Sequence, residues 1–495
     1  MKKRAFFLSM ILSVIIAGCS SSGDSADEGV VLRVCNWEEY IDLGDWDEEE
    51  TIDLESGDII GENALYEDFE EWYYETYGEH VKVEYSCFGT NEELYNMLTL
   101  GDEFDLVCPS DYMFMKLMTE DKLTAFSDGF FDEDIPENYY VRNVSPFIRE
   151  KFDDHEIGGE RWSEYAAAYM WGVTGFLYDP EKVDAEKMNS WNALCDPELK
   201  RQITIKDNVR DAYFPALAGL KRDLLTDPAF IGDPDYAARL EREMNDNTEE
   251  TVDAALGWLQ AAKDNAYSFE TDSGKADIVS GKVLANVQWS GDAVYAMDQA
   301  EEDGFLLAYS VPEECTNLWF DGWVMLKDGV GADEKKQKAA EAFVNFISRP
   351  DNAVRNMYYI GYTSSISGGT DGDAVFEYAE WTYGAEDDEE EPEEYDLSWF
   401  FDRGEDEEYM IETSEDQITR QLFAQYPTPE VMERSSIMCY FDDEANARIN
   451  HMWINVRCFN LEKIPMFWRM VIALMILGVV AVFSAYRLHK KRSGR

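Results

Sequence analysis

One stretch decides the fold: residues 81–108 read VKVEYSCFGTNEELYNMLTLGDEFDLVC. Residues 81–88 and 104–108 have the apolar, β-branched character of strands. Between them, Asn91 is placed to cap a helix with its apolar side chains inward, and Gly101 is placed to end it. The stretch therefore predicts a strand–helix–strand unit.

The same alternation extends upstream. Residues 30–36 predict another strand, and residues 65–76 carry apolar side chains on one helical face with Gly78 as a stop. Residues 41–61 between them are acidic, with few core residues, and predict a loop. A strand–helix–strand–helix–strand order indicates a parallel α/β sheet.

A second α/β unit begins near residues 171–175. A short strand at 203–205 leads into a helix that starts near Asp207 and Asn208, either of which suits its N-cap. Residues 283–289 predict a further strand. Later strands, at 306–312 and 323–326, would return the chain to the first unit. Since 495 residues exceed one hydrophobic core, we expect at least two lobes.

The strongest chemical pattern is Trp319-Phe320-Asp321-Gly322-Trp323, which sets two indole rings around one carboxylate. Aromatic faces and a carboxylate together suit an organic cation. Three similar pieces occur elsewhere: Asn36-Trp37-Glu38-Glu39-Tyr40, Pro109-Ser110-Asp111-Tyr112 and Gln288-Trp289-Ser290-Gly291-Asp292. We interpret these pieces as parts of one amine site.

The places of these residues in the predicted fold support the interpretation that they form one amine site. Trp37 with Tyr40, and Ser110 with Tyr112, follow strand ends, where ligands gather in α/β sheets. Asp211 lies in the first turn of the predicted helix. A helix N-terminus repels an ammonium group, so a cation site there needs a carboxylate to reverse the local potential.

Composition narrows the class of ligand. The formal net charge of −61 argues against nucleic-acid partners, because phosphates would be repelled. It favours cations only weakly, since an acidic surface also serves solubility. The eight cysteines form no CxxC pair, and we interpret Cys35, Cys87 and Cys108 as small buried apolar residues. No metal or other cofactor is predicted.

Both ends of the chain predict membrane anchors. A basic start, an apolar run and Ile16-Ala17-Gly18-Cys19 resemble a bacterial lipoprotein signal at residues 1–19, with lipid on Cys19 and a tether at 20–29. Residues 466–486 predict a transmembrane helix, and 487–495 a basic cytoplasmic tail. These signals place the globular part outside the cytoplasm, either extracellular or periplasmic.

From about Val31 to Arg457, the chain resembles the spermidine/putrescine-binding lipoproteins of polyamine ABC importers. The resemblance is carried by the order and spacing of several short pieces. They are Asn36-Trp37-Glu38-Glu39-Tyr40, Asp105-Leu106-Val107-Cys108-Pro109-Ser110, Trp171-Gly172-Val173-Thr174-Gly175, Ser190-Trp191-Asn192-Ala193-Leu194, Val209-Arg210-Asp211, Trp289, Trp319-Phe320-Asp321, Arg349-Pro350-Asp351 and Ile360-Gly361-Tyr362.

The resemblance implies an α/β, two-lobed type II periplasmic-binding-protein fold with a ligand cleft between the lobes. The predicted first lobe is 30–174, completed by about 318–368. The predicted second lobe is 175–317, completed by about 369–464, with an exposed acidic insertion at about 385–416. The implied partners are a polyamine and the permease and ATPase subunits of an importer.

Carried over by position, the resemblance implies an aromatic box and two acids. The implied ligand-binding residues are Trp37, Glu39, Tyr40, Ser110, Tyr112, Asn208, Asp211, Trp289, Trp319, Asp321 and Tyr362. Asp321 and Asp211 would each hold an ammonium group. Asn208 departs from the family, whose spermidine binders carry an aspartate there. A family glutamine also finds no equivalent around residues 434–438.

A membrane-tethered amine sensor that hands nothing to a permease is one alternative from the sequence, and two others remain open. One is a binding protein for another small organic cation, such as thiamine or an amino-acid conjugate. The other is an extracellular hydrolase that uses Asp211 and Asp321 as paired carboxylates. No GxSxG, HExxH or phosphate-loop motif supports catalysis, so the prediction is a protein that is not an enzyme.

Overall fold

The computed structural model describes residues 29–47, 50–369, 371–385, 392–402, 404 and 408–458. The predicted signal segment with Cys19, the transmembrane helix at 466–486 and the tail at 487–495 lie outside the described residues. Within the described ranges, no helix has the length and apolar character needed to cross a membrane.

A 12-stranded sheet runs through the described part of the protein. Its main order is β11-β10-β12-β9-β14-β5-β1-β4, and β6, β13, β15 and β18 pair at its sides. The strands are β1 (Val30–Trp37), β4 (Val81–Phe88), β5 (Leu106–Val107), β6 (Leu123–Thr124), β9 (Ala166–Tyr178), β10 (Ile203–Lys206), β11 (Phe269–Glu270), β12 (Ala285–Trp289), β13 (Ala308–Ser310), β14 (Thr316–Leu326), β15 (Thr363–Ser364) and β18 (Ser435–Ser436).

The first lobe is built on the parallel strands β4-β1-β5, as the opening stretch predicts. Helix α1 (Leu65–Tyr77) ends at Gly78, whose φ of 68° is the left-handed conformation that glycine adopts readily. Helix α2 (Asn91–Leu100) starts one residue earlier than predicted. Its N-cap is Thr90, whose hydroxyl accepts the Glu93 N–H, so the prediction of Asn91 as the cap is wrong.

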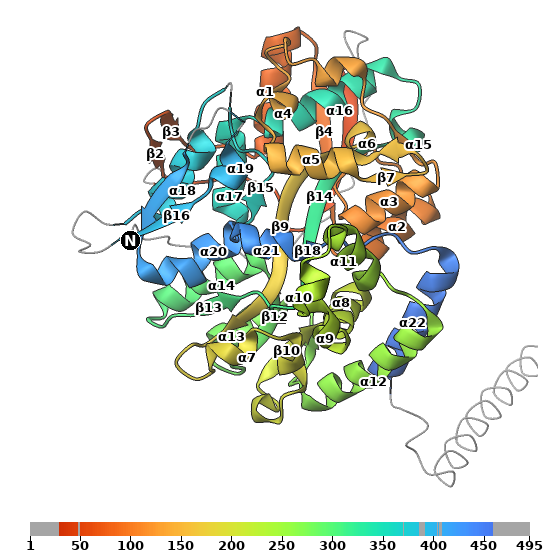
Figure 1. Ribbon diagram of the computed structural model, residues 1–495. Coiled ribbons are helices and arrows are strands. Elements are labelled where there is room, and N and C mark those ends of the chain that lie inside the picture. Colours follow the sequence, from red (N-terminus) through yellow and green to blue (C-terminus); the bar gives the residue numbers. More distant parts are fainter. Residues whose placement is uncertain are drawn as a thin grey trace, which may run out of the picture.

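Other helices cover this sheet (Figure 1). They are α3 (Asp111–Thr119), α4 (Tyr139–Asn143), α5 (Pro146–Asp154), α6 (Trp162–Tyr165), α15 (Lys327–Val330), α16 (Glu334–Ile347) and α17 (Pro350–Ile360). Two short hairpins are β2 (Ile52–Leu54) with β3 (Gly57–Ile59), and β7 (Glu156–Ile157) with β8 (Glu160–Arg161). The first hairpin lies in residues 41–61 and corrects the predicted loop, because Ile52, Leu54 and Ile59 are buried.

Strands β9 and β14 join the two lobes. They pair antiparallel from Leu318↔Val173 to Val324↔Ala166, and every residue in both strands is buried. The far half of β9 pairs with β12 and β13 instead. Figure 1 shows β9 and β14 side by side through the middle of the molecule, between an upper and a lower group of elements.

The second lobe is built on β10, β11 and β12, with β10 parallel to both neighbours and β12 antiparallel to β9. Helix α8 (Val209–Leu220) starts after the N-cap Asn208, whose side chain accepts the Arg210 and Asp211 N–H groups. The other helices are α7 (Ala185–Met188), α9 (Arg222–Leu225), α10 (Pro228–Ile231), α11 (Tyr236–Met244), α12 (Glu249–Asn265), α13 (Ser273–Val279) and α22 (Asp443–Arg457).

The predicted acidic insertion is folded in part. Strands β16 (Glu393–Asp396) and β17 (Met410–Thr413) pair with each other, and α19 (Ser398–Phe401) lies between them in the chain. Residues 386–391, 403 and 405–407 lie outside the described residues. Five apolar side chains of this region are buried, which corrects the expectation of an exposed segment: Tyr395, Leu397, Phe400, Phe401 and Ile411.

The buried apolar side chains form two clusters, as expected for two lobes. Residues 374–437 contribute to the first cluster, with α18 (Ala374–Tyr383), α20 (Gln421–Gln425) and α21 (Pro429–Glu433), whereas residues 438–456 contribute to the second. The lobe boundaries given above remain predictions. Cys35 and Cys108 are buried as predicted, but Cys87 is exposed.

Candidate ligand-binding site

Asp321 on β14 is the centre of the candidate site. Its Oδ2 accepts a hydrogen bond of 2.8 Å from the Tyr40 hydroxyl, and its Oδ1 accepts one of 2.7 Å from Ser110 Oγ. Tyr40 follows β1, and Ser110 follows β5 and precedes α3. The predicted convergence of these pieces at strand ends is therefore present around Asp321.

The Asp321 carboxylate is buried without a countercharge. The residue is 6% exposed, and within the described part of the chain no lysine or arginine forms an ion pair with it. Burial raises the pKa of Asp321 to about 6, although the Ser110 and Tyr40 hydroxyl groups lower it in part. A buried acid with neutral donors only is ready to accept a cation.

Aromatic rings surround this acid. The Trp319 and Tyr362 rings lie 5.6 Å apart, and the Tyr362 and Tyr40 rings lie 5.3 Å apart in an edge-to-face arrangement. Two glycines make room for them. A Cβ at Gly172 would lie 2.5 Å from the Trp319 ring, and a Cβ at Gly291 would lie 2.1 Å from the Tyr362 ring.

A second acid–aromatic pair lies in the second lobe. The indole N–H of Trp289 donates to Asp211 Oδ1 at 3.1 Å, and Asp211 lies in the first turn of α8. Burial raises the pKa of Asp211, whereas the Trp289 hydrogen bond and the Lys206 charge lower it. Asn208 serves as the cap of this helix, so its amide oxygen is already engaged with the backbone.

A series of contacts connects the two acid–aromatic groups. The Tyr362 hydroxyl donates a hydrogen bond of 3.0 Å to Asp292 Oδ1. Asp292 lies on α14 (Ser290–Glu302), and its other contacts lead into the second lobe. Asp292 Oδ2 lies 3.8 Å from Lys206 Nζ, which in turn lies 4.1 Å from the Trp289 ring centroid. Tyr40, Trp319, Tyr362 and Trp289, predicted from separate sequence pieces, therefore belong to one continuous region.

Tyr112 also lies between the lobes. Its hydroxyl accepts a hydrogen bond of 3.0 Å from Asn91, and its ring lies 5.3 Å from the Arg210 guanidinium carbon. Asn91 also donates to Ser110 Oγ at 3.1 Å, so it orients two of the predicted residues. Arg210 comes from the second lobe, and the contact with Tyr112 shows that the lobes meet here.

Two predicted residues lie apart from these groups. Trp37 packs against Phe88 with ring centroids 4.7 Å apart, and its indole N–H is buried without a hydrogen-bond partner in the described residues. Glu39 is exposed, with a φ of 55°, and forms no hydrogen bond or ion pair among the described residues. The structure does not bring Glu39 to Asp321.

Sequence reasoning gave no binding role to four residues of this region: Asn91, Lys206, Arg210 and Asp292. Arg210 and Asp292 were only quoted within longer pieces. Asn91 was interpreted only as a cap. Lys206 carried a usable signal, because a lysine at the end of an apolar strand is unusual and calls for a buried partner. In the described ranges, no group of histidine, cysteine and acidic side chains is arranged to hold a metal ion.

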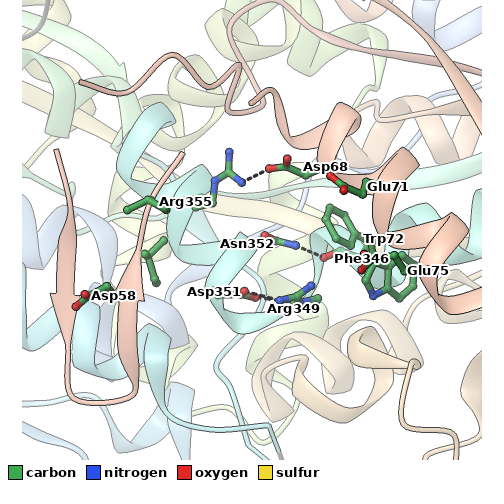
Figure 2. Close-up of a pocket in the computed structure, with 12 residues that line it drawn as sticks. Asp58, Asp68, Glu71, Trp72, Glu75, Phe346, Arg349, Asp351, Asn352 and Arg355 are labelled. Carbon is green, nitrogen blue, oxygen red and sulfur yellow. Dashed lines mark hydrogen bonds and ion pairs between the residues drawn. The ribbon is translucent and has the colours of Figure 1, made fainter. Parts of the chain in front are cut away.

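A cavity of about 450 Å³ lies elsewhere in the first lobe, among the β2–β3 hairpin, α1 and α17 (Figure 2). Its arginines already pair with carboxylates: Arg355 with Asp68 at 2.7 Å, and Arg349 with Asp351 at 2.6 Å. None of the predicted site residues lines it. We therefore place the candidate site at Asp321 rather than in this cavity.

The fold is that of the two-lobed α/β binding proteins, in which a ligand lies where strand ends from both lobes meet. Residues 64–381 match the family model for bacterial extracellular solute-binding proteins. The chain belongs to this family.

Named relatives agree with the family. The spermidine/putrescine-binding periplasmic protein of Escherichia coli K12 is 25% identical over 363 residues, which cover 70% of this chain and 82% of that protein. The putrescine-binding periplasmic protein PotF of the same organism is 25% identical over 372 residues, which cover 72% and 85%. Both are binding proteins, which supports the prediction that this chain is not an enzyme.

Solved structures show the same fold. The spermidine/putrescine ABC transporter substrate-binding protein PotD of Streptococcus pneumoniae superposes with a TM-score of 0.55 at 21% identity, covering 86% of this chain and 98% of that one. A putative spermidine/putrescine ABC transporter protein of Listeria monocytogenes gives 0.55 at 20% identity, covering 87% and 99%. The resemblance inferred from sequence motifs is confirmed.

Proposed function

We propose that this protein is the substrate-binding component of an ABC importer and captures a polyamine, spermidine or putrescine, between its lobes. The observation that carries the proposal is Asp321, a buried carboxylate held by two neutral hydroxyl groups, without a cation in the described residues. The names of the relatives supply the class of ligand.

The chemistry of a polyamine fits this arrangement. Its ammonium groups need carboxylates, and a charge-assisted hydrogen bond contributes about 1.5–3 kcal/mol. Its methylene groups need apolar surface, and each buried methylene contributes about 0.8 kcal/mol. Aromatic faces serve both parts, since a cation over a ring gains about 0.5–2 kcal/mol. Together these contributions reach micromolar affinity after the cost of association.

We assign the ligand-binding roles by the geometry. Asp321, with Tyr40 and Ser110, would hold one ammonium group, and Asp211, with Trp289, would hold the other. Trp319 and Tyr362 would flank the chain between them. Tyr112 is proposed as a flanking contact because it meets Arg210 between the lobes. For Trp37 and Asn208 as flanking contacts, and for Glu39 as a charge at the exposed rim, the proposal rests on the family resemblance alone.

Delivery and anchoring complete the proposal. We expect the closed lobes to dock on a permease that works with an ATPase subunit. Lipid on Cys19 and a helix at 466–486 would keep the globular part at the outer face of the cell membrane. Mass spectrometry of the N-terminal peptide would test the lipid, because an unmodified thiol at Cys19 contradicts it.

Calorimetry on the full chain in detergent tests the ligand. Putrescine and spermidine should bind with micromolar or tighter affinity, whereas thiamine, arginine and maltose should not. Tight binding of thiamine with no binding of either polyamine would replace the proposed ligand. Turnover of a glycan or amide substrate would refute the assignment as a binding protein.

A further inference from the structure

The second lobe already contains an ammonium group in its part of the site. Lys206 is the last residue of β10, and its side chain is 1% exposed. Its Nζ lies 4.1 Å from the centroid of the Trp289 ring and donates to the Thr271 carbonyl oxygen at 3.0 Å. One face of Trp289 is therefore occupied by a cation of the protein itself.

The same lysine forms ion pairs with the acidic side chains next to it. Lys206 Nζ lies 3.4 Å from Glu270 and 3.8 Å from Asp292, whose side chains are 1% and 9% exposed. Asp292 also pairs with Lys275 at 3.2 Å. Lys275 also lies 3.4 Å from the exposed Asp272. The two buried acids, Glu270 and Asp292, thus each have a lysine partner, and neither is free to receive a ligand cation.

Two carboxylates of the site remain without an ion pair in the described part of the chain, namely the half-buried Asp211 and the buried Asp321. A third acid, the buried Asp111, accepts backbone N–H groups of Tyr112 and Phe320 and lies near the positive charge of Arg210. Arg210 is itself buried, and it adds positive charge to this end of the site.

We propose that Lys206 acts as a resident ammonium group that limits the ligand to two positive charges, so that the site selects a diamine over a triamine. This inference rests on the proposed function. It assigns a specificity role to a residue outside the set carried over from the family resemblance.

The physical reason is the balance of charge. A diamine can place one ammonium group at Asp321 and the other at Asp211, with methylene groups along the rings. The third ammonium group of spermidine would lie near Lys206 or Arg210, or at the exposed Glu92, which is 3.4 Å from the Tyr112 hydroxyl. Repulsion between buried cations is strong, and an exposed carboxylate in water gives little in return.

Trp289 adds a second reason. A cation on one face of an indole reduces the attraction of the ring for another cation on the opposite face, because both draw on the same quadrupole. Within the described residues, Trp289 packs against no other aromatic ring. We therefore expect its second face to contact methylene groups of the ligand, while Asp211 receives the charge.

Calorimetry on the full chain in detergent at pH 7.5, with putrescine and spermidine as probes, tests the inference. The wild-type protein should bind putrescine about tenfold or more tightly than spermidine. Lys206→Met keeps the length of the side chain and removes the charge, and it should shift this ratio about tenfold or more toward spermidine. Because Glu270 then loses its partner, the double variant K206M/E270Q provides the same test if the single variant does not fold.

Lys275→Met is the matched control. It removes the other lysine of Asp292, but this lysine is one-quarter exposed and does not lie over Trp289. Its affinity ratio should stay within about threefold of the wild type, since the Lys275 charge lies over the Tyr295 ring and is paired with Asp272 and Asp292. An equal shift in K275M, an unchanged ratio in K206M and the double variant, or tighter wild-type binding of spermidine would each overturn the inference. Those results leave the proposed function intact, whereas wild-type binding of neither amine would refute both.

Discussion

Replacement of Asp321 by asparagine should separate binding from stability. The amide keeps the shape of the side chain and removes its charge. The bound amine then loses a charge-assisted hydrogen bond worth about 1.5–3 kcal/mol, which corresponds to roughly 10- to 150-fold weaker binding. Calorimetry with putrescine measures this loss directly.

The same change should stabilise the protein without ligand. Burial moves the pKa of Asp321 from 3.8 to about 6, and each pKa unit corresponds to about 1.4 kcal/mol. The ionised form therefore costs up to about 3 kcal/mol in the ligand-free state. Asparagine removes this cost but leaves one hydroxyl without its acceptor, at about 1 kcal/mol. We expect a net gain of about 1–2 kcal/mol above pH 6.

The direction of this pH dependence follows from the linkage between protonation and folding. A carboxyl group whose pKa is raised by folding lowers the free energy of unfolding only when it is ionised. The loss is absent below the unfolded pKa near 4, grows between pH 4 and 6, and is complete above pH 6. Thermal melts of ligand-free D321N should thus exceed those of wild type at pH 7.5 but not at pH 4. Asp277→Asn is a matched control, since Asp277 is also buried and pairs with Lys282 away from the site. Unchanged putrescine affinity in D321N, or a lower melting temperature at pH 7.5, would refute the reasoning.

Three further predictions concern the same site. Amine affinity should fall as the pH drops below about 6, by up to tenfold per unit, because Asp321 must be ionised while the amine stays charged; a flat profile from pH 7.5 to 5 would contradict this. Tyr40→Phe removes one of the two hydroxyl groups that lower the pKa of Asp321, so the midpoint of that profile should move to higher pH. Gly291→Ala places a methyl group against the Tyr362 ring and should weaken putrescine binding about tenfold or more. The control Gly257→Ala has open space at its Cβ, so it should leave affinity unchanged and add up to about 1 kcal/mol of helix stability. Equal affinities of the two variants would exclude a role for the position of the Tyr362 ring.

Much of the site could be predicted because its residues follow strand ends. Tyr40 and Ser110 lie past β1 and β5, and the rule that ligands gather there led to the pieces that hold Asp321. The alternation of strands and helices likewise predicted the parallel sheet of the first lobe. These are local patterns, and local patterns can be seen in a sequence.

The features of the fold and site that could not be predicted from the sequence depend mostly on contacts between distant segments. Lys206 has its role only because Glu270 and Asp292 come from other elements, which no local pattern indicates. The β16–β17 hairpin was hidden by its acidic composition, although Tyr395 and Ile411 alternate with charged residues as in a half-buried strand. Thr90 and Asn91 are both good caps, and only the backbone decides between them.

The path of β14 sets an order for dissociation. This strand carries Trp319 and Asp321 and pairs with β5 of the first lobe just beyond them, at Val324 and Met325. We expect the second lobe to open by rotation about the paired strands, so that Asp211 and Trp289 withdraw while Asp321 stays with its hydroxyl partners. A polyamine should therefore leave from one end first and pass through a singly held intermediate, which relaxation-dispersion measurements on a labelled ligand would detect as a second, slower exchange process.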